Sequence, residues 1–132
     1  MDETLVIVKP DAVRRGLIGE ILSRIERKGL RIVEMRTMRI APRLAEEHYA
    51  EHREKPFFTE LVEFITSGDV VVARVAGEGA VPVVRELMGP TDPAQAPPGT
   101  IRGDFGLLIT ENLIHGSDSP ETAKRELDLF FG

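Results

Sequence analysis

The chain has 132 residues, of which 42% are hydrophobic and 30% charged, and its net charge is −5. This length suits one domain with a single core, so we expect residues 1–132 to form one domain. The acidic balance argues against broad nucleic-acid binding, which needs a basic surface, but allows a small anionic ligand held by local cations. The lack of cysteine excludes disulfides, a thiolate nucleophile and a cysteine-ligated metal.

Nothing in the sequence indicates a membrane protein. The acidic start, Met1-Asp2-Glu3, has neither the basic nor the apolar region of a signal peptide. No segment approaches the roughly 20 apolar residues that a membrane span needs. We therefore expect a cytoplasmic protein with no membrane partner and no obligatory nucleic-acid partner.

The first third of the chain predicts strand, helix and strand. Residues 4–8 form a short β-branched run typical of a buried strand. Apolar residues at helical spacing over residues 18–25 predict a helix that ends at Lys28-Gly29. Residues 30–40 predict a long strand, and the alternation of its polar residues shifts near Val33, which indicates a bulge or a twist there.

The middle of the chain predicts a pair of helices, a third strand and a further helix. The pair covers residues 42–52, which are mostly polar, and 57–65, which carry an apolar face. Residues 70–75 predict the strand. The spacing of apolar residues over 80–87 predicts the last of these helices, which Gly89-Pro90 ends.

The last third begins with an aperiodic stretch, residues 90–103, which holds four prolines. Loops of this length in compact domains are often functional, and we expect this one to be so. Residues 106–110 predict a fourth strand. The final helix starts with Ser119 as N-cap and Pro120 at the first helical position.

These elements predict an α+β fold, an α/β sandwich of the ferredoxin-like βαββαβ type. The four strands form an antiparallel sheet, and the two helices of the βαββαβ frame cover one face of it. The helix pair at 42–65 is an insertion, and the helix after Ser119 is a C-terminal addition. The strand at 30–40 is expected at an edge, where a long exposed strand favours pairing with a second subunit.

His48 and His52 match the H-x-x-E-H pattern of some zinc proteases. Two histidines at this spacing share a helix face, but a third ligand would have to come from elsewhere in the chain. The surrounding glutamates favour a solvated polar helix, and we adopt that interpretation.

A polar stretch from Asn112 to Asp118 brings an amide, an imidazole, a hydroxyl and a carboxylate together. Between a strand at 106–110 and a helix after Ser119, we expect His115 to lie in a turn, open to a substrate. Glu126 falls at the edge of the buried stripe of the last helix. The pattern leaves two interpretations open for Glu126: a carboxylate that orients His115, or a rim residue reaching water.

Cations elsewhere in the chain fit a phosphate ligand. Lys9 follows the first strand, and Arg102 lies between glycines in the long loop, a poor place for packing. Together with Arg85 and His115 they would suit phosphate groups. Taken alone, Arg85 is better interpreted as part of a solvated helix face.

Five segments together resemble the nucleoside diphosphate kinase family, in family order and over nearly the whole chain. The segments are residues 4–11 (TLVIVKPD), 48–52 (HYAEH), 55–58 (KPFF), 98–105 (PGTIRGDF) and 112–118 (NLIHGSD). Several motifs in register are stronger support than one short pattern.

The resemblance implies a kinase that moves a γ-phosphoryl group from a nucleoside triphosphate to a diphosphate in a ping-pong cycle. It makes His115 the nucleophile, phosphorylated on its pros nitrogen, although the sequence alone does not distinguish the two nitrogens. The resemblance further implies support from Ser117 and Glu126 and phosphate and sugar contacts from Lys9, Tyr49, Arg85, Thr91, Arg102 and Asn112. By the same resemblance, Phe57 would stack on the base with Ile109 near its other face, and Mg²⁺ would travel on the phosphates with Asp118 as its protein neighbour.

The implied chemistry agrees with physical expectation. Phosphoryl transfer requires mainly positioning and charge stabilisation, and an imidazole, whose ordinary pKa is about 6.5, is largely neutral and nucleophilic near pH 7. Stacking is tolerant of base identity, so broad base specificity follows. The family further implies a homo-oligomer, tetramer or hexamer, with ATP and GDP among its substrates. A non-catalytic ligand sensor on the same frame is the alternative, since fold does not fix function.

Overall fold

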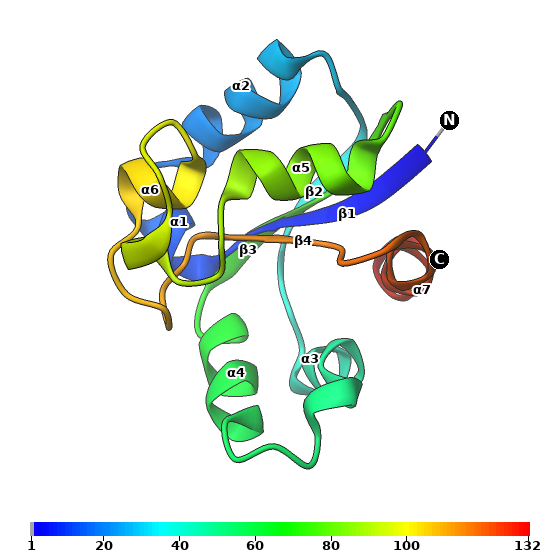
Figure 1. The fold of residues 1–132 in the computed structure, drawn as a ribbon. Helices are drawn as coiled ribbons and strands as arrows, with labels where there is room; N and C mark the ends of the chain where they lie inside the picture. The colour runs from blue at the N-terminus through cyan, green and yellow to red at the C-terminus, as the bar shows by residue number, and fades with distance from the viewer. Residues whose placement is uncertain (1) are drawn as a thin grey trace.

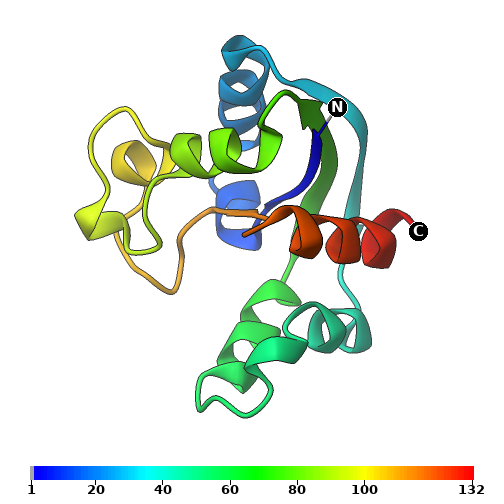
Figure 2. The same ribbon diagram turned by 45° about the vertical axis from the view of Figure 1, so that its right-hand side comes forward.

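An antiparallel four-stranded sheet forms the middle layer of the protein (Figures 1 and 2). The computed structural model describes residues 2–132. The strands are β1 (Asp2–Val8), β2 (Arg31–Arg39), β3 (Asp69–Gly77) and β4 (Ile114–Gly116), in the spatial order β2-β3-β1-β4. The predicted ferredoxin-like arrangement is confirmed, with β2 at an edge of the sheet.

Helices cover both faces of this sheet. The frame helices and the added ones are α2 (Ile18–Lys28), α5 (Ala80–Met88), α3 (Pro42–His48), α4 (Phe58–Ile65) and α7 (Pro120–Phe131). Shorter helical turns are α1 (Pro10–Arg14), η1 (Ala50–His52), η2 (Pro93–Gln95) and α6 (Ile101–Phe105). The frame helices α2 and α5 lie on one face, as predicted, whereas α3, α4 and α7 lie on the other (Figure 1).

The central strand β1 explains how one sheet supports two cores. Val6 and Val8 pack in the cluster that includes α2 and α5, while Leu5 and Ile7 pack in the cluster that includes α3, α4 and α7. All four side chains are fully buried. A strand covered on both faces is apolar throughout, which is the pattern that the sequence shows at this position.

Local sequence signals act as predicted in three places. Gly29 closes α2 in a left-handed conformation, with φ of 109°. The register of β2 against β3 shifts between Ile32 and Glu34, which confirms the irregularity predicted near Val33. The Ser119 hydroxyl accepts a hydrogen bond from the Thr122 N–H at 3.1 Å and caps α7.

The prediction of a fourth strand at residues 106–110 was wrong. Leu107, Leu108 and Ile109 are exposed by 76, 53 and 56%, and the chain turns there without pairing. The strand that pairs with β1 is the three-residue β4, flanked by the fully buried Leu113. A strand this short offers no alternation to detect, whereas the preceding apolar run resembles a strand but faces outward.

Two further segments differ from their predicted form. The stretch from 90 to 103 contains η2 and the start of α6, where the Thr100 hydroxyl accepts from the Gly103 N–H at 2.9 Å. The helix predicted over 42–52 breaks at Tyr49 into α3 and η1. In residues 2–132, no helix is long and apolar enough to cross a bilayer.

Gly116 lets helix α5 approach β4 closely. A Cβ atom at this position would lie 2.6 Å from Met88 Sδ and 2.9 Å from Val84 Cγ1. We expect Gly116→Ala to lower the free energy of unfolding by about 1–3 kcal/mol through overpacking, measured by urea denaturation. Gly19→Ala is the matched control: its Cβ meets no atom within 4 Å on α2, so it should stabilise by up to about 1 kcal/mol. Equal stability of the two variants would contradict this packing.

Candidate active site

His115 lies on β4, directly opposite Ile7 of β1. Opposed residues of an antiparallel pair point to the same face, so the imidazole lies on the face that α7 and α3 cover. The side chain keeps 18% exposure. The expected turn position was wrong, because β4 extends through His115 and the bend follows at Asp118 and Ser119.

Glu126 of α7 contacts the imidazole of His115 at its Nε2 atom. Its Oε1 lies 2.9 Å from His115 Nε2 and accepts a hydrogen bond from Ser117 Oγ at 2.7 Å. Ser117 Oγ in turn accepts from the Leu5 N–H at 3.2 Å. Glu126 is only 3% exposed. The buried, partnered interpretation of Glu126 therefore describes the structure, and the solvated one does not.

The protonation state of this pair follows from its surroundings. Burial alone would raise the pKa of Glu126, but the hydrogen bond and charge of His115, with smaller effects from His48 and Ser117, hold that pKa below its ordinary value. An ionised Glu126 requires a proton on His115 Nε2. The other ring nitrogen, Nδ1, then carries the lone pair.

A second histidine, His48, completes the group and was missed as a site residue. It is 4% exposed at the end of α3, with its ring 4.7 Å from that of His115 at an interplanar angle of 80°. Burial, and then His115, lower the pKa of His48 to about 3, so it is neutral. The predicted solvated helix was wrong here. The signal available in the sequence was the apolar pair Leu44-Ala45, four and three residues earlier on the same helix face.

Lys9, Asn112 and Thr91 form a second linked group. Lys9 Nζ donates to Asn112 Oδ1 at 2.9 Å, and Asn112 Nδ2 donates to the Thr91 carbonyl at 3.0 Å. Burial, and then the charge of Arg102, lower the pKa of Lys9 to about 8. The structure therefore connects the end of β1 to the segment that leads into β4.

Arg102 differs from its predicted setting. It lies on helix α6, is 4% exposed, and donates to the carbonyls of Asn112 at 3.0 Å, Gly89 at 3.0 Å and Ile114 at 2.6 Å. The expectation of an arginine poorly placed for packing was wrong. These bonds use three of the five guanidinium N–H groups. Burial, and then Arg85, lower the pKa of Arg102 to about 10.

Arg85 is bound to the stretch around His115 and is not a free surface cation. Its Nη1 donates to the Gly116 carbonyl at 3.2 Å and to Asp118 Oδ1 at 2.8 Å. The Asp118 side chain remains 68% exposed. Both groups thus lie at the outer end of β4, next to the start of α7.

Three predicted nucleotide contacts differ in exposure. Tyr49 packs edge-on against His48 with ring centroids 4.7 Å apart, and burial raises the pKa of its phenol. Phe57 precedes α4 and is 43% exposed, with Lys55 Nζ 5.8 Å from its ring centroid. Ile109 is 56% exposed in the segment before β4. Phe57 and Ile109 are thus available to an apolar ligand surface.

Leu113, two residues before His115, has φ of 74°, the one positive φ of a non-glycine among residues 2–132. Such a conformation costs about 1–3 kcal/mol and persists only where its surroundings impose it. The Leu113 N–H donates to Asp11 Oδ2 at 3.1 Å, and its carbonyl accepts from the Lys9 N–H at 2.9 Å. Asp11 and Leu113 were missed as site residues, because a backbone dihedral leaves no periodic signal.

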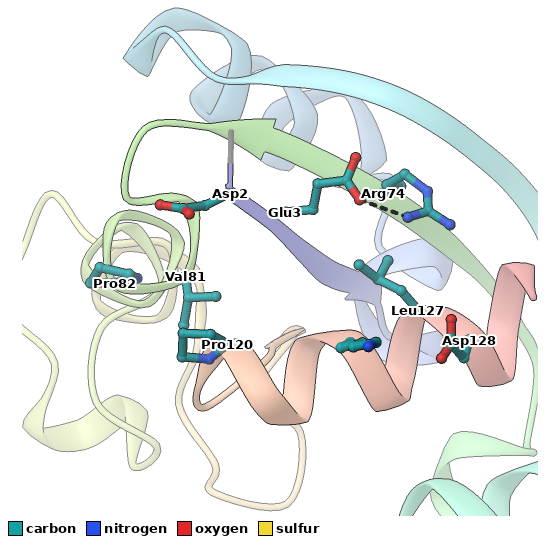
Figure 3. A pocket seen from close by; sticks show the side chains of 9 residues that line it. Asp2, Glu3, Arg74, Val81, Pro82, Pro120, Leu127 and Asp128 are labelled. Carbon is teal, nitrogen blue, oxygen red and sulfur yellow. Dashed lines mark hydrogen bonds and ion pairs between the residues drawn. The ribbon is translucent and has the colours of Figure 1, made fainter.

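The cavity drawn in Figure 3 is separate from His115. It measures about 300 Å³ and lies between the start of β1, α5 and α7. Its lining residues are Asp2, Glu3, Arg74, Val81, Pro82, Pro120, Lys124, Leu127 and Asp128. None of these is a residue that the sequence assigned to the site, and the dashed ion pair of Arg74 with Glu3 occupies part of its wall.

The fold and the site together define an α/β sandwich protein with a histidine-centred site flanked by cations. A family model for nucleoside diphosphate kinase matches residues 2–132. The nucleoside diphosphate kinase of Rubrobacter xylanophilus is 67% identical over 132 residues, which cover 100% of this chain and 99% of that protein. The Thermus thermophilus enzyme of that name is 61% identical over 131 residues, 99% of this chain and 96% of that one.

Solved structures agree. A nucleoside diphosphate kinase from Halobacterium salinarum in complex with CDP matches with a TM-score of 0.96 and 55% identity, over 98% of this chain and 87% of that one. The apo enzyme from Encephalitozoon cuniculi matches with a TM-score of 0.98 and 41% identity, over 100% and 90%. The chain belongs to the nucleoside diphosphate kinase family. It is an enzyme, a phosphotransferase that moves the γ-phosphoryl group of a nucleoside triphosphate to a nucleoside diphosphate.

His48 makes stability depend on pH. Its pKa is about 3 in the folded protein and about 6.5 in the unfolded chain, so only the unfolded state takes up the proton as pH falls below 6.5. Stability is therefore lost as the pH drops. Between pH 7 and pH 5 this group should lower the free energy of unfolding by about 2 kcal/mol. In urea titrations at the two pH values, His48→Leu should lose that much less than the wild type, and an equal loss in both would contradict the assignment.

Proposed function

We propose that His115 carries the phosphoryl group on Nδ1 during a ping-pong cycle. The observation that carries this proposal is the hydrogen bond of Nε2 to the buried Glu126 carboxylate. Nδ1 attacks the γ-phosphorus, an N–P bond forms, and the bond from phosphorus to the β–γ bridging oxygen breaks to release the diphosphate. A second diphosphate then attacks the phosphohistidine and regenerates His115.

Cations around His115 would stabilise the negative charge of the phosphate groups while the phosphoryl group is transferred. Lys9, Arg85 and Arg102 bring three positive groups to the two segments that flank the imidazole. Arg102 keeps two unused N–H groups, and Lys9 donates to a neutral amide, so both can serve phosphate oxygens. Tyr49 and Ser117 belong to the same proposed catalytic set, Tyr49 through the phosphates and Ser117 through Glu126.

Nucleotide binding would depend on stacking more than on base recognition. Phe57 and Ile109 are exposed apolar side chains suited to the two faces of a base. Thr91, Asn112 and the three cations would hold sugar and phosphates. This supports broad base specificity, with ATP and GDP among the substrates, and a role in keeping nucleoside triphosphate pools. The Halobacterium relative with CDP bound is in line with such a ligand.

The divalent metal of this kinase reaction is proposed to be Mg²⁺, held mainly by the phosphates. Asp118 offers an exposed carboxylate oxygen beside Arg85, and one such oxygen fits an ion that keeps several waters. The ion would neutralise phosphate charge and align the γ-phosphoryl group. Asp118 would then have to exchange its bond with Arg85 for one with the ion.

The assembly is proposed to be a homo-oligomer, a tetramer or a hexamer. Support comes from the edge strand β2, where Val33 and Met35 are 46 and 56% exposed, and from the exposed Leu107 and Leu108. Exposed apolar residues along an edge strand favour pairing with another copy.

A single domain over residues 1–132 and a cytoplasmic location remain predictions of the sequence.

Labelling with γ-³²P-ATP in the absence of an acceptor tests the proposed intermediate. We expect one phosphoryl group per chain, labile to acid and stable to base, which GDP removes. The chain has three histidines, so single variants assign the site. His115→Ala should abolish the label, whereas His52→Gln should keep it. Label on a folded His115→Ala protein, or none on the wild type, would overturn the proposal.

Glu126→Gln tests the orienting carboxylate. The amide keeps the shape but loses the charge that fixes the Nε2–H tautomer, so we expect kcat to fall about 10²-fold while nucleotide affinity changes little. Glu121→Gln, exposed on the same helix, is the matched control and should behave as wild type. Stopped-flow phosphorylation and nucleotide titration separate the two effects. Weaker binding with an unchanged transfer rate would contradict the role.

A further inference from the structure

His48, His115 and Glu126 form a cluster of metal-ligating side chains. One ligand atom from each lies within 4.8 Å of the others. Glu126 stands between the two rings: Oε1 lies 2.9 Å from His115 Nε2, and Oε2 lies 3.6 Å from His48 Nδ1. Two imidazoles and one carboxylate are a donor set that zinc and related transition metals bind.

We propose that a Zn²⁺-class ion binds this cluster through His48, His115 and Glu126 and blocks the histidine. The binding site stands on the geometry alone, whereas its effect on catalysis rests on the proposed function of His115. The ion differs from the Mg²⁺ of the reaction in donor set and position. It would act as an inhibitor, because it engages the same imidazole that carries the phosphoryl group.

His48 is the side chain that needs such a partner. It is 4% exposed, and within residues 2–132 its Nδ1 makes no hydrogen bond. The 3.6 Å to Glu126 Oε2 is too long for a hydrogen bond. Two ligands of a tetrahedral ion, each at 2.0–2.1 Å, lie roughly 3.4 Å apart. An ion between these atoms therefore needs only small movements of the two side chains.

The protonation states of the free cluster already suit a metal. Burial keeps His48 neutral, and the partners of Glu126 keep its carboxylate ionised. The neighbouring cations repel any divalent ion. Arg125 Nη2 lies 4.0 Å from Glu126 Oε2, and the positive charge of Lys9 is near enough to lower the pKa of His48. Mg²⁺ prefers oxygen ligands and retains water, so it gains little here. An ion with strong affinity for imidazole overcomes the repulsion best.

Binding would change the tautomer of His115. The ion needs the Nε2 lone pair, so the proton that Nε2 donates to Glu126 must leave. A neutral imidazole then carries its proton on Nδ1, by exchange with solvent and with no net proton release. The Nδ1 lone pair that would attack phosphorus is lost. The ion thus inhibits by converting the nucleophilic nitrogen into an N–H donor.

Calorimetric titration of ZnCl₂ into the chelator-treated full chain, with excess MgCl₂ present, tests the site. We expect one ion per chain, with binding about 10-fold or more weaker in His48→Asn. His52→Gln is the matched control: it removes a neighbouring histidine outside the cluster and should bind as wild type. No binding by the wild type, or equal binding by folded His48→Asn, would overturn the site.

Nitrogen spectra of the ¹⁵N-histidine-labelled wild type remain decisive if a variant fails to fold. On adding Zn²⁺, His115 Nδ1 should change from an unprotonated to a protonated signal, and chelator should reverse it. An unchanged His115 tautomer in the zinc-bound protein would refute the mechanism of inhibition. The result is independent of catalysis, since zinc binding without any phosphotransfer would leave the site standing and remove the proposed function.

Discussion

The buried carboxylate of Glu126 is the interaction on which the rest of the site depends. An ionised carboxylate away from water is costly unless hydrogen bonds compensate it. Its Oε1 has two such partners, His115 Nε2 and Ser117 Oγ, and Ser117 also receives the Leu5 N–H of β1. Helix α7 is thereby fixed to the sheet through the same contacts that fix the imidazole. Stability and reactivity at this point are therefore not separable: a change that frees the imidazole also leaves a buried charge without its partner.

A second constraint acts from the opposite side of the sheet. The left-handed Leu113 is held by the Asp11 carboxylate through its N–H and by the Lys9 N–H through its carbonyl. The chain reverses there and enters β4 in register with β1, so that His115 meets Ile7. Lys9 thus makes two contacts with this segment: its backbone N–H donates to the Leu113 carbonyl, and its side chain donates to Asn112. The end of β1 positions both the proposed nucleophile and a cation for its substrate.

Apolar runs made β1 and β3 predictable, since both faces of these strands are buried, and helical spacing made α2 and α5 predictable, since each buries one face. The β4 strand was not, since three residues carry no period and the outward-facing run at 106–110 imitates a strand. The five segments in family order identified the family, while the burial of Arg102 and His48 depended on tertiary contacts that spacing does not encode. His48 appears polar in sequence and is a neutral core residue because it is buried against His115 and against Phe130 of α7, and this burial, followed by the charge of His115, lowers its pKa.

Two of the three cations of the proposed site are bonded to neutral groups, which would let an acidic chain hold a polyphosphate. Arg102 donates to three backbone carbonyls and Lys9 to an amide oxygen, so neither charge is cancelled by a carboxylate at hydrogen-bond distance. Arg85 is different, since Asp118 pairs with it at 2.8 Å, but that carboxylate is exposed and would leave Arg85 in the proposed nucleotide complex. Burial lowers the pKa of Lys9 and of Arg102, which reflects the cost of holding these charges without a counterion. A bound phosphate would relieve that cost. The cost of burying these unpaired cations therefore favours the binding of an anion, although the net charge of the whole chain is −5.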